Sequence, residues 1–171
     1  SSQWSLMRVV FPQVKIDEIG EDAWIFLPRA PGEIQQGIWR RKYEHERVYP
    51  DPWMTMQYMA SYTDDGSVGL YVATHDPMGG PKRMTVRSRP EERTVDFIFD
   101  HPVAEMSKSG NDFELTGEGV WQLFRGDWFD ASMIYKDWVR GNARWFPELT
   151  KDGRSDTPEW ARDVSIWCRL F

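Results

Sequence analysis

The run MTMQYMASYTDDGSVGLYVAT, residues 54–74, carries the clearest signal for the fold class. Residues 54–62 are mostly apolar with polar interruptions, and residues 68–74 form a second short apolar run. Between them, Asp64-Asp65-Gly66-Ser67 carries residue types that favour a tight turn. Two strand-like runs separated by such a turn predict an antiparallel β-hairpin.

Similar runs lie on both sides of this hairpin. Residues 82–89 (KRMTVRSR) and 93–99 (RTVDFIF) alternate between apolar and polar side chains. Short strands at about this spacing are typical of an antiparallel sandwich or barrel. We therefore predict a mainly β fold, an antiparallel β-sandwich over residues 1–126. Its other expected strands are 6–16, where Pro12 marks an edge or a bulge, 23–27, and one or two within 113–124, with loops at 28–37 and 76–81.

A single helix is expected after the strands, within residues 127–146. Apolar side chains recur there at three- and four-residue steps, which predicts one buried helical face of a helix 14–18 residues long. Asp127 is the expected N-cap, Asp130 suits the first turn, and Pro147 limits the other end. The residues of the apolar face are Trp128, Ala131, Tyr135, Trp138 and Val139.

The last part of the chain, residues 147–171, reads as a linker followed by the start of another domain. Residues 149–157 are polar and rich in turn formers. The run 163–171 (DVSIWCRLF) predicts a strand buried on both faces, as in a parallel sheet. We expect that this strand has its partners in a part of the protein beyond residue 171.

Composition excludes several classes of function. A net charge of −6 argues against nucleic-acid binding, and no apolar run is long enough to cross a membrane. The single cysteine, Cys168, excludes an internal disulfide framework, and His45, His75 and His101 are too scattered to form a two-histidine metal site. We therefore predict no metal and no cofactor. Residues 1–13 lack the features of a signal peptide, so an exported protein would carry its signal upstream.

Aromatic residues are unusually frequent, with ten tryptophans in 171 residues. Indole rings fill cores, and they also stack on the C–H faces of sugars. Trp39, Trp53 and Tyr58 lie, with Tyr49, in or beside a polar, proline-bearing stretch, and we predict them as a carbohydrate-binding platform. The alternative is that these rings clamp the open end of the sandwich.

A second group of candidates lies where the predicted strand 68–74 ends. His75 and Asp76 are followed by a glycine-rich loop and then by Lys82. Strand ends and the loops after them often carry binding groups, so we predict that these three residues contact the carbohydrate. The alternative is structural, with Asp76 capping the turn and His75 bonded to backbone.

Three segments resemble one family. YPDPWMTMQYMASYTDDGSVGLYVATHDPMGGPKRM (49–84), FRGDWFDASMIYKDW (124–138) and PEWARDVSIWCRLF (158–171) resemble, in the same order, uncharacterised bacterial glycoside-hydrolase-like proteins. The resemblance implies an N-terminal sandwich similar to galactose mutarotase, a linking helix, and a (β/α)₈ barrel that holds the catalytic carboxylates. Only the first barrel strand falls within this chain, so no catalytic residue is carried over.

The expected function is a non-catalytic N-terminal domain of a bacterial glycoside hydrolase, which supports the missing barrel and contacts an oligo- or polysaccharide. The alternatives are a stand-alone carbohydrate-binding module, a small complete enzyme with two facing carboxylates, and a structural domain without ligand. An extracellular or periplasmic location is expected. A homo-oligomer would shield the uncovered last strand.

Overall fold

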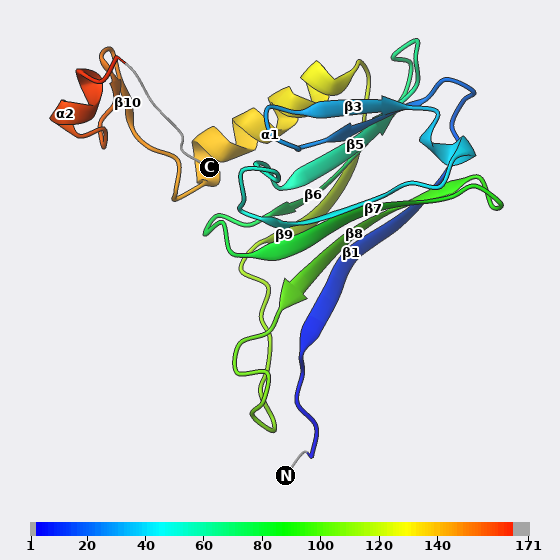
Figure 1. Ribbon diagram of the computed structural model, residues 1–171, viewed down its shortest axis with the longest axis horizontal. Coiled ribbons are helices and arrows are strands. Elements are labelled where there is room, and N and C mark those ends of the chain that lie inside the picture. Colours follow the sequence, from blue (N-terminus) through cyan, green and yellow to red (C-terminus); the bar gives the residue numbers. More distant parts are fainter. Residues whose placement is uncertain (1–2, 166–171) are drawn as a thin grey trace.

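The computed structural model describes residues 3–165 and is built on two main antiparallel sheets. The four-stranded sheet has the order β1-β8-β7-β4, and the five-stranded sheet has the order β3-β2-β5-β6-β9 (Figure 1). The strands are β1 (Arg8–Asp17), β2 (Trp24–Leu27), β3 (Glu33–Gln36), β4 (Glu44–Tyr49), β5 (Tyr58–Tyr62), β6 (Gly69–His75), β7 (Lys82–Arg89), β8 (Thr94–Pro102) and β9 (Glu118–Phe124). The predicted mainly β sandwich is confirmed.

The hairpin predicted from residues 54–74 is β5 paired with β6, with Tyr62 opposite Gly69. In its turn the amide of Ser67 donates to Asp65 Oδ1 at 3.0 Å. Gly66 adopts a φ of 66°, a conformation that glycine reaches without steric cost. Turn chemistry and apolar runs therefore set this part of the fold locally.

The N-terminal strand also follows its prediction. β1 lies at the edge of the four-stranded sheet, and its register with β8 shifts between Val10 and Gln13, around Pro12. Proline has no amide hydrogen to donate to a ladder, so an edge or a bulge is where it fits. Residues 33–36 depart from the prediction, because part of the expected loop pairs with β2 as strand β3.

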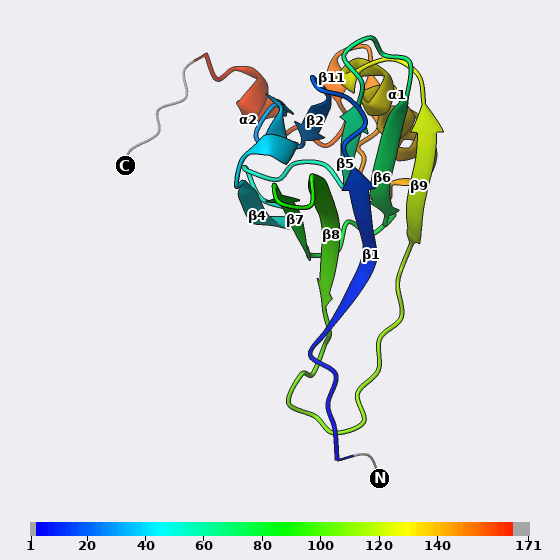
Figure 2. The same cartoon turned by 90° about the vertical axis from the view of Figure 1, so that its right-hand side faces the viewer.

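Helix α1 (Trp128–Asn142) packs on the face of the five-stranded sheet that points away from the other sheet (Figures 1 and 2). Asp127 caps the helix, with its Oδ1 2.7 Å from the amide of Phe129, and Asp130 completes a capping box. Tyr135 is buried on the sheet, as predicted. Trp128, the first residue of the helix, was predicted in this core but is 42% exposed.

The molecule therefore has three layers and two cores. Between the sheets lie side chains such as Leu27, Met59 and Phe97, and between the five-stranded sheet and α1 lie Tyr58, Tyr71 and Tyr135. A short 3₁₀ helix (Ile38–Arg40) contributes to the first core.

The C-terminal part contains a small hairpin and a one-turn helix. β10 (Leu149–Thr150) pairs with β11 (Gly153–Arg154) where the sequence predicts an unstructured linker, and α2 spans Glu159–Arg162. The strand predicted over residues 163–171 lies mostly outside the described residues. Within residues 3–165, no helix combines the length and the apolar character needed to cross a membrane.

Candidate functional site

The loop between β6 and β7 is held by a buried ion pair of two predicted site residues. Asp76 follows the last residue of β6 and Lys82 is the first residue of β7. Lys82 Nζ lies 3.3 Å from Asp76 Oδ2, 2.6 Å from Gln57 Oε1 and 2.7 Å from the carbonyl oxygen of Gly80. An ammonium group has three donors, so these contacts use all of them.

Asp76 is equally well satisfied. Its Oδ1 accepts hydrogen bonds from the amide of Met78 at 2.9 Å and from Thr116 Oγ1 at 2.8 Å, and its Oδ2 accepts from the amide of Gly80 at 2.8 Å. Burial raises the pKa of Asp76, but these hydrogen bonds and Lys82 outweigh it and hold the pKa below its usual value. Burial lowers the pKa of Lys82, and Asp76 opposes that shift.

The geometry of the pair agrees with the structural alternative, in which Asp76 caps the turn. The carboxylate closes the loop over Met78 and Gly80, and the ammonium closes it from the other end. A ligand reaching Lys82 would have to displace an existing partner of a side chain that is 1% exposed. We therefore assign the pair to the architecture of the loop.

His75 contacts side chains instead of the backbone that the structural alternative predicted. Its Nε2 lies 2.8 Å from the Tyr71 hydroxyl, and its ring stacks on Trp138 with 4.5 Å between centroids. Burial lowers the pKa of His75 to about 4, so the imidazole is neutral at pH 7. His75 thus links β6 to helix α1.

The predicted aromatic platform is not assembled. Trp39 is 1% exposed and donates from Nε1 to the carbonyl oxygen of Ile16 at 3.4 Å. Tyr58 is fully buried within β5, where its ring stacks on Phe26 and Tyr71. Both were predicted to face a sugar, and this prediction is wrong for the structure described, since neither ring reaches the surface.

Of the two tryptophans predicted for the platform, Trp53 has an exposed ring. It is 49% exposed, and the guanidinium of Arg29 lies 5.8 Å from the ring centroid. Tyr49 is buried beneath Lys82, whose Nζ is 4.8 Å from its ring. Trp39 and Tyr49 thus pack in the core between the sheets, Tyr58 packs between the five-stranded sheet and α1, and Trp53 stays exposed.

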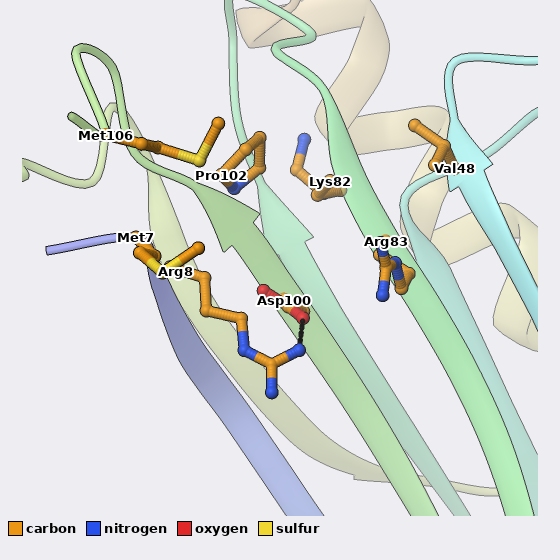
Figure 3. Close-up of a pocket in the computed structure, with 8 residues that line it drawn as sticks. All are labelled: Met7, Arg8, Val48, Lys82, Arg83, Asp100, Pro102 and Met106. Atoms are coloured by element: carbon orange, nitrogen blue, oxygen red, sulfur yellow. Dashed lines mark hydrogen bonds and ion pairs between the residues drawn. The ribbon is translucent and has the colours of Figure 1, made fainter.

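A pocket of about 490 Å³ lies on the outer face of the four-stranded sheet. Strand register explains why its residues meet: Val48 pairs with Arg83, and Arg83 pairs with Asp100, so the three side chains lie in one row on one face. Arg8 pairs with Pro102, two residues further along the same face of β8. Figure 3 shows this arrangement, with Met7 and Met106 on the side of β1.

One ion pair joins two residues of the pocket, and a second ties a lining arginine to a residue outside it. Arg8 Nη1 donates to Asp100 Oδ2 at 3.1 Å, and Arg83 lies 3.6 Å from Glu46. The side chain of Asp100 is 12% exposed, whereas that of Arg8 is 64% exposed. Lys82 contributes to the wall, but its ammonium points away from Asp100 (Figure 3). Of the predicted site residues, only Lys82 touches this pocket.

Our sequence prediction missed the pocket, although part of the signal was present. Strands β7 and β8 place arginines and aspartates on their outward positions, including Arg83, Arg89, Asp96 and Asp100. This alternation indicates a charged sheet face. The contributions of Arg8, Val48 and Met106 depend on strand order, which the sequence does not reveal.

The part of the chain that the structure describes has no cluster of three or more histidine, cysteine, aspartate or glutamate side chains that could hold a metal ion. Among the pocket's lining residues, Asp100 is the one carboxylate. The pocket therefore does not present the two facing carboxylates that glycoside hydrolysis usually requires.

Comparisons with known proteins give a distant relationship. Residues 113–170 match a family described as a domain of unknown function, DUF6259. A protein of Monosiga brevicollis named "Putative glycoside hydrolase 22789" is 28% identical over 154 residues. No solved structure is significantly similar to the chain. The alignment covers 86% of this chain and 12% of the Monosiga brevicollis protein, so the chain is a distant homologue of a small part of a glycoside-hydrolase-like protein.

Proposed function

We propose that this chain is a non-catalytic β-sandwich domain of a glycoside-hydrolase-like protein, where it supports a catalytic barrel and contacts carbohydrate. The observation that carries the proposal is the alignment with 12% of a protein named as a glycoside hydrolase, which leaves the remaining 88% of that protein for other domains. The sandwich itself supplies a pocket with one carboxylate, Asp100, which is already bound to Arg8.

Two assays on the whole chain test this proposal. Incubation with soluble polysaccharides and chromogenic glycosides should release no sugar, because glycosidic cleavage needs an acid and a second carboxylate placed around the scissile bond. A glycan array should retain the chain. Hydrolysis that disappears on Asp100→Asn would overturn the non-catalytic assignment, and an array without binding would overturn the carbohydrate contact.

A structural domain without ligand is the second candidate, and one observation favours it. Trp39 and Tyr58, which a binding platform would expose, are buried in the two cores. The array separates the candidates, because a purely structural domain retains no glycan.

A further inference from the structure

We propose that the pocket on the outer face of the four-stranded sheet binds a neutral sugar, with Arg8 and Asp100 as the hydrogen-bond partners of its hydroxyl groups. This inference rests on the proposed function and assigns its carbohydrate contact to a place in the fold. The site differs from the loop aromatics that the sequence indicated, because its side chains come from β1, β4, β7, β8 and the segments just before β1 and after β8.

The charge balance of the pocket favours a neutral ligand. Three cationic side chains line the pocket, and each has an acidic partner: Arg8 with Asp100 at 3.1 Å, Arg83 with Glu46 at 3.6 Å, and Lys82 with Asp76 at 3.3 Å. An anionic or cationic ligand would compete with one of these pairs and leave a charge without its partner. A neutral ligand leaves all three pairs intact.

Arg8 and Asp100, on the floor of the pocket, keep hydrogen-bonding capacity beyond the bond that joins them. A guanidinium has five N–H donors, and within the described residues the Arg8 side chain uses one, to Asp100 Oδ2. A carboxylate offers several acceptor sites, of which this bond occupies one. The pair thus offers charged donors and acceptors side by side. Adjacent hydroxyl groups of a sugar match them, since one can accept from Arg8 while its neighbour donates to Asp100.

Apolar side chains form the wall of the pocket. Met7, Met106 and Val48 are 63%, 49% and 48% exposed, and they line the pocket together with Pro102. These apolar groups suit the C–H face of a sugar ring, and methionine side chains adapt to irregular shapes. The volume of about 490 Å³ lies within the range of small-molecule sites. No aromatic ring is among the lining residues, so the hydrogen bonds to Arg8 and Asp100 supply the directional contacts.

The test is an NMR titration of the ¹⁵N-labelled chain with neutral oligosaccharides of glucose, xylose and mannose, and with oligogalacturonate as the charged comparison. Arg8→Gln removes the guanidinium from an exposed position, and Asp100→Asn replaces the acceptor carboxylate by a neutral amide of the same size. The matched control is Arg89→Gln. It breaks the Arg89–Asp96 pair on the same sheet face, where Arg89 is 41% exposed and Asp96 is buried, outside the pocket.

We expect a neutral oligosaccharide to shift the amides around Arg8, Arg83 and Asp100. Arg8→Gln and Asp100→Asn should each weaken that binding at least about 10-fold, the effect of losing a hydrogen bond to a charged group, while Arg89→Gln binds as the wild type does. Circular dichroism confirms that each variant is folded.

Two results would overturn the pocket assignment while leaving the proposed function in place. One is binding that both pocket variants retain, with shifts around Trp53 instead. The other is oligogalacturonate binding as tightly as any neutral sugar. Absence of binding to every glycan would overturn the carbohydrate contact and the pocket assignment together.

Discussion

Lys82 and Asp76 join the two sheets of the sandwich at one end. Their ammonium and carboxylate groups are 3.3 Å apart, and their side chains are 1% and 5% exposed. Strand β6, which ends just before Asp76, belongs to the five-stranded sheet, and β7, which begins at Lys82, belongs to the four-stranded sheet. The loop between them therefore crosses from one sheet to the other, and the ion pair holds that crossing in place.

Lys82→Met should destabilise the protein by about 3–5 kcal/mol, because it leaves the buried carboxylate of Asp76 without its cation. Urea unfolding followed by tryptophan fluorescence measures the change. Lys108→Met is the control: its pair with Glu105 is exposed, with side chains 65% and 61% accessible, and its loss should cost less than about 1 kcal/mol. Equal effects in the two variants would contradict a structural role for Lys82.

Gly117→Ala should destabilise the same end of the sandwich by about 1–3 kcal/mol. A Cβ atom at residue 117 would lie 2.1 Å from the carbonyl oxygen of His75 and 2.7 Å from Asp76 Cα, so the backbone must move and draw Thr116 away from Asp76. Gly20→Ala is the matched control, since nothing lies within 4 Å of its added Cβ. Thermal unfolding compares the two, and a Gly117→Ala melting temperature equal to that of Gly20→Ala would show that the approach is looser than described.

His75→Phe should make stability less dependent on pH between about 6.5 and 4. The ordinary histidine pKa of 6.5 falls to about 4 in the folded protein through burial. Between these values the unfolded chain binds more protons than the folded one, so the free energy of unfolding falls as the pH falls. The phenylalanine ring can still stack on Trp138 but cannot titrate. Urea titrations at pH 7, 5.5 and 4.5 test this.

His45 and His101 also have lowered pKa values, chiefly through burial, and they add to the slope in both proteins. The difference between the wild type and His75→Phe therefore isolates the contribution of His75. Parallel pH profiles would mean that the imidazole protonates in the folded state as easily as in the unfolded state.

Trp39→Ala and Trp53→Ala should differ sharply in stability. Trp39 is buried between the sheets, and its truncation should cost about 3–5 kcal/mol through lost contacts and a cavity. Trp53 is 49% exposed, and its truncation should change the free energy of unfolding by about 0.5 kcal/mol or less. Chemical unfolding of both variants measures the contrast. A costly Trp53→Ala would place that ring in a packed environment.

The difference in burial between these two tryptophans could not be predicted from the sequence. Both lie in polar, proline-bearing surroundings, and no local pattern separates them. Trp39 is buried because the 3₁₀ helix at Ile38–Arg40 turns it between the sheets, where its Nε1 reaches the carbonyl of Ile16 in β1, 23 residues earlier. Burial of this kind depends on contacts between distant segments.

Elements with local causes could be predicted from the sequence: the hairpin of β5 and β6, the bulge at Pro12 in β1, the strands β7 and β8, and the helix capped by Asp127. Turn residues, apolar period and capping groups act over a few residues and can be read in order along the chain. Which aromatic rings are exposed depends on tertiary packing, and so does the placing of Arg8, Val48, Arg83 and Asp100 on one face. Pairing of β1 with β8 joins residues up to 94 positions apart, such as Arg8 and Pro102, and strand order is fixed by burial of the whole core, so neither follows from a few neighbouring residues.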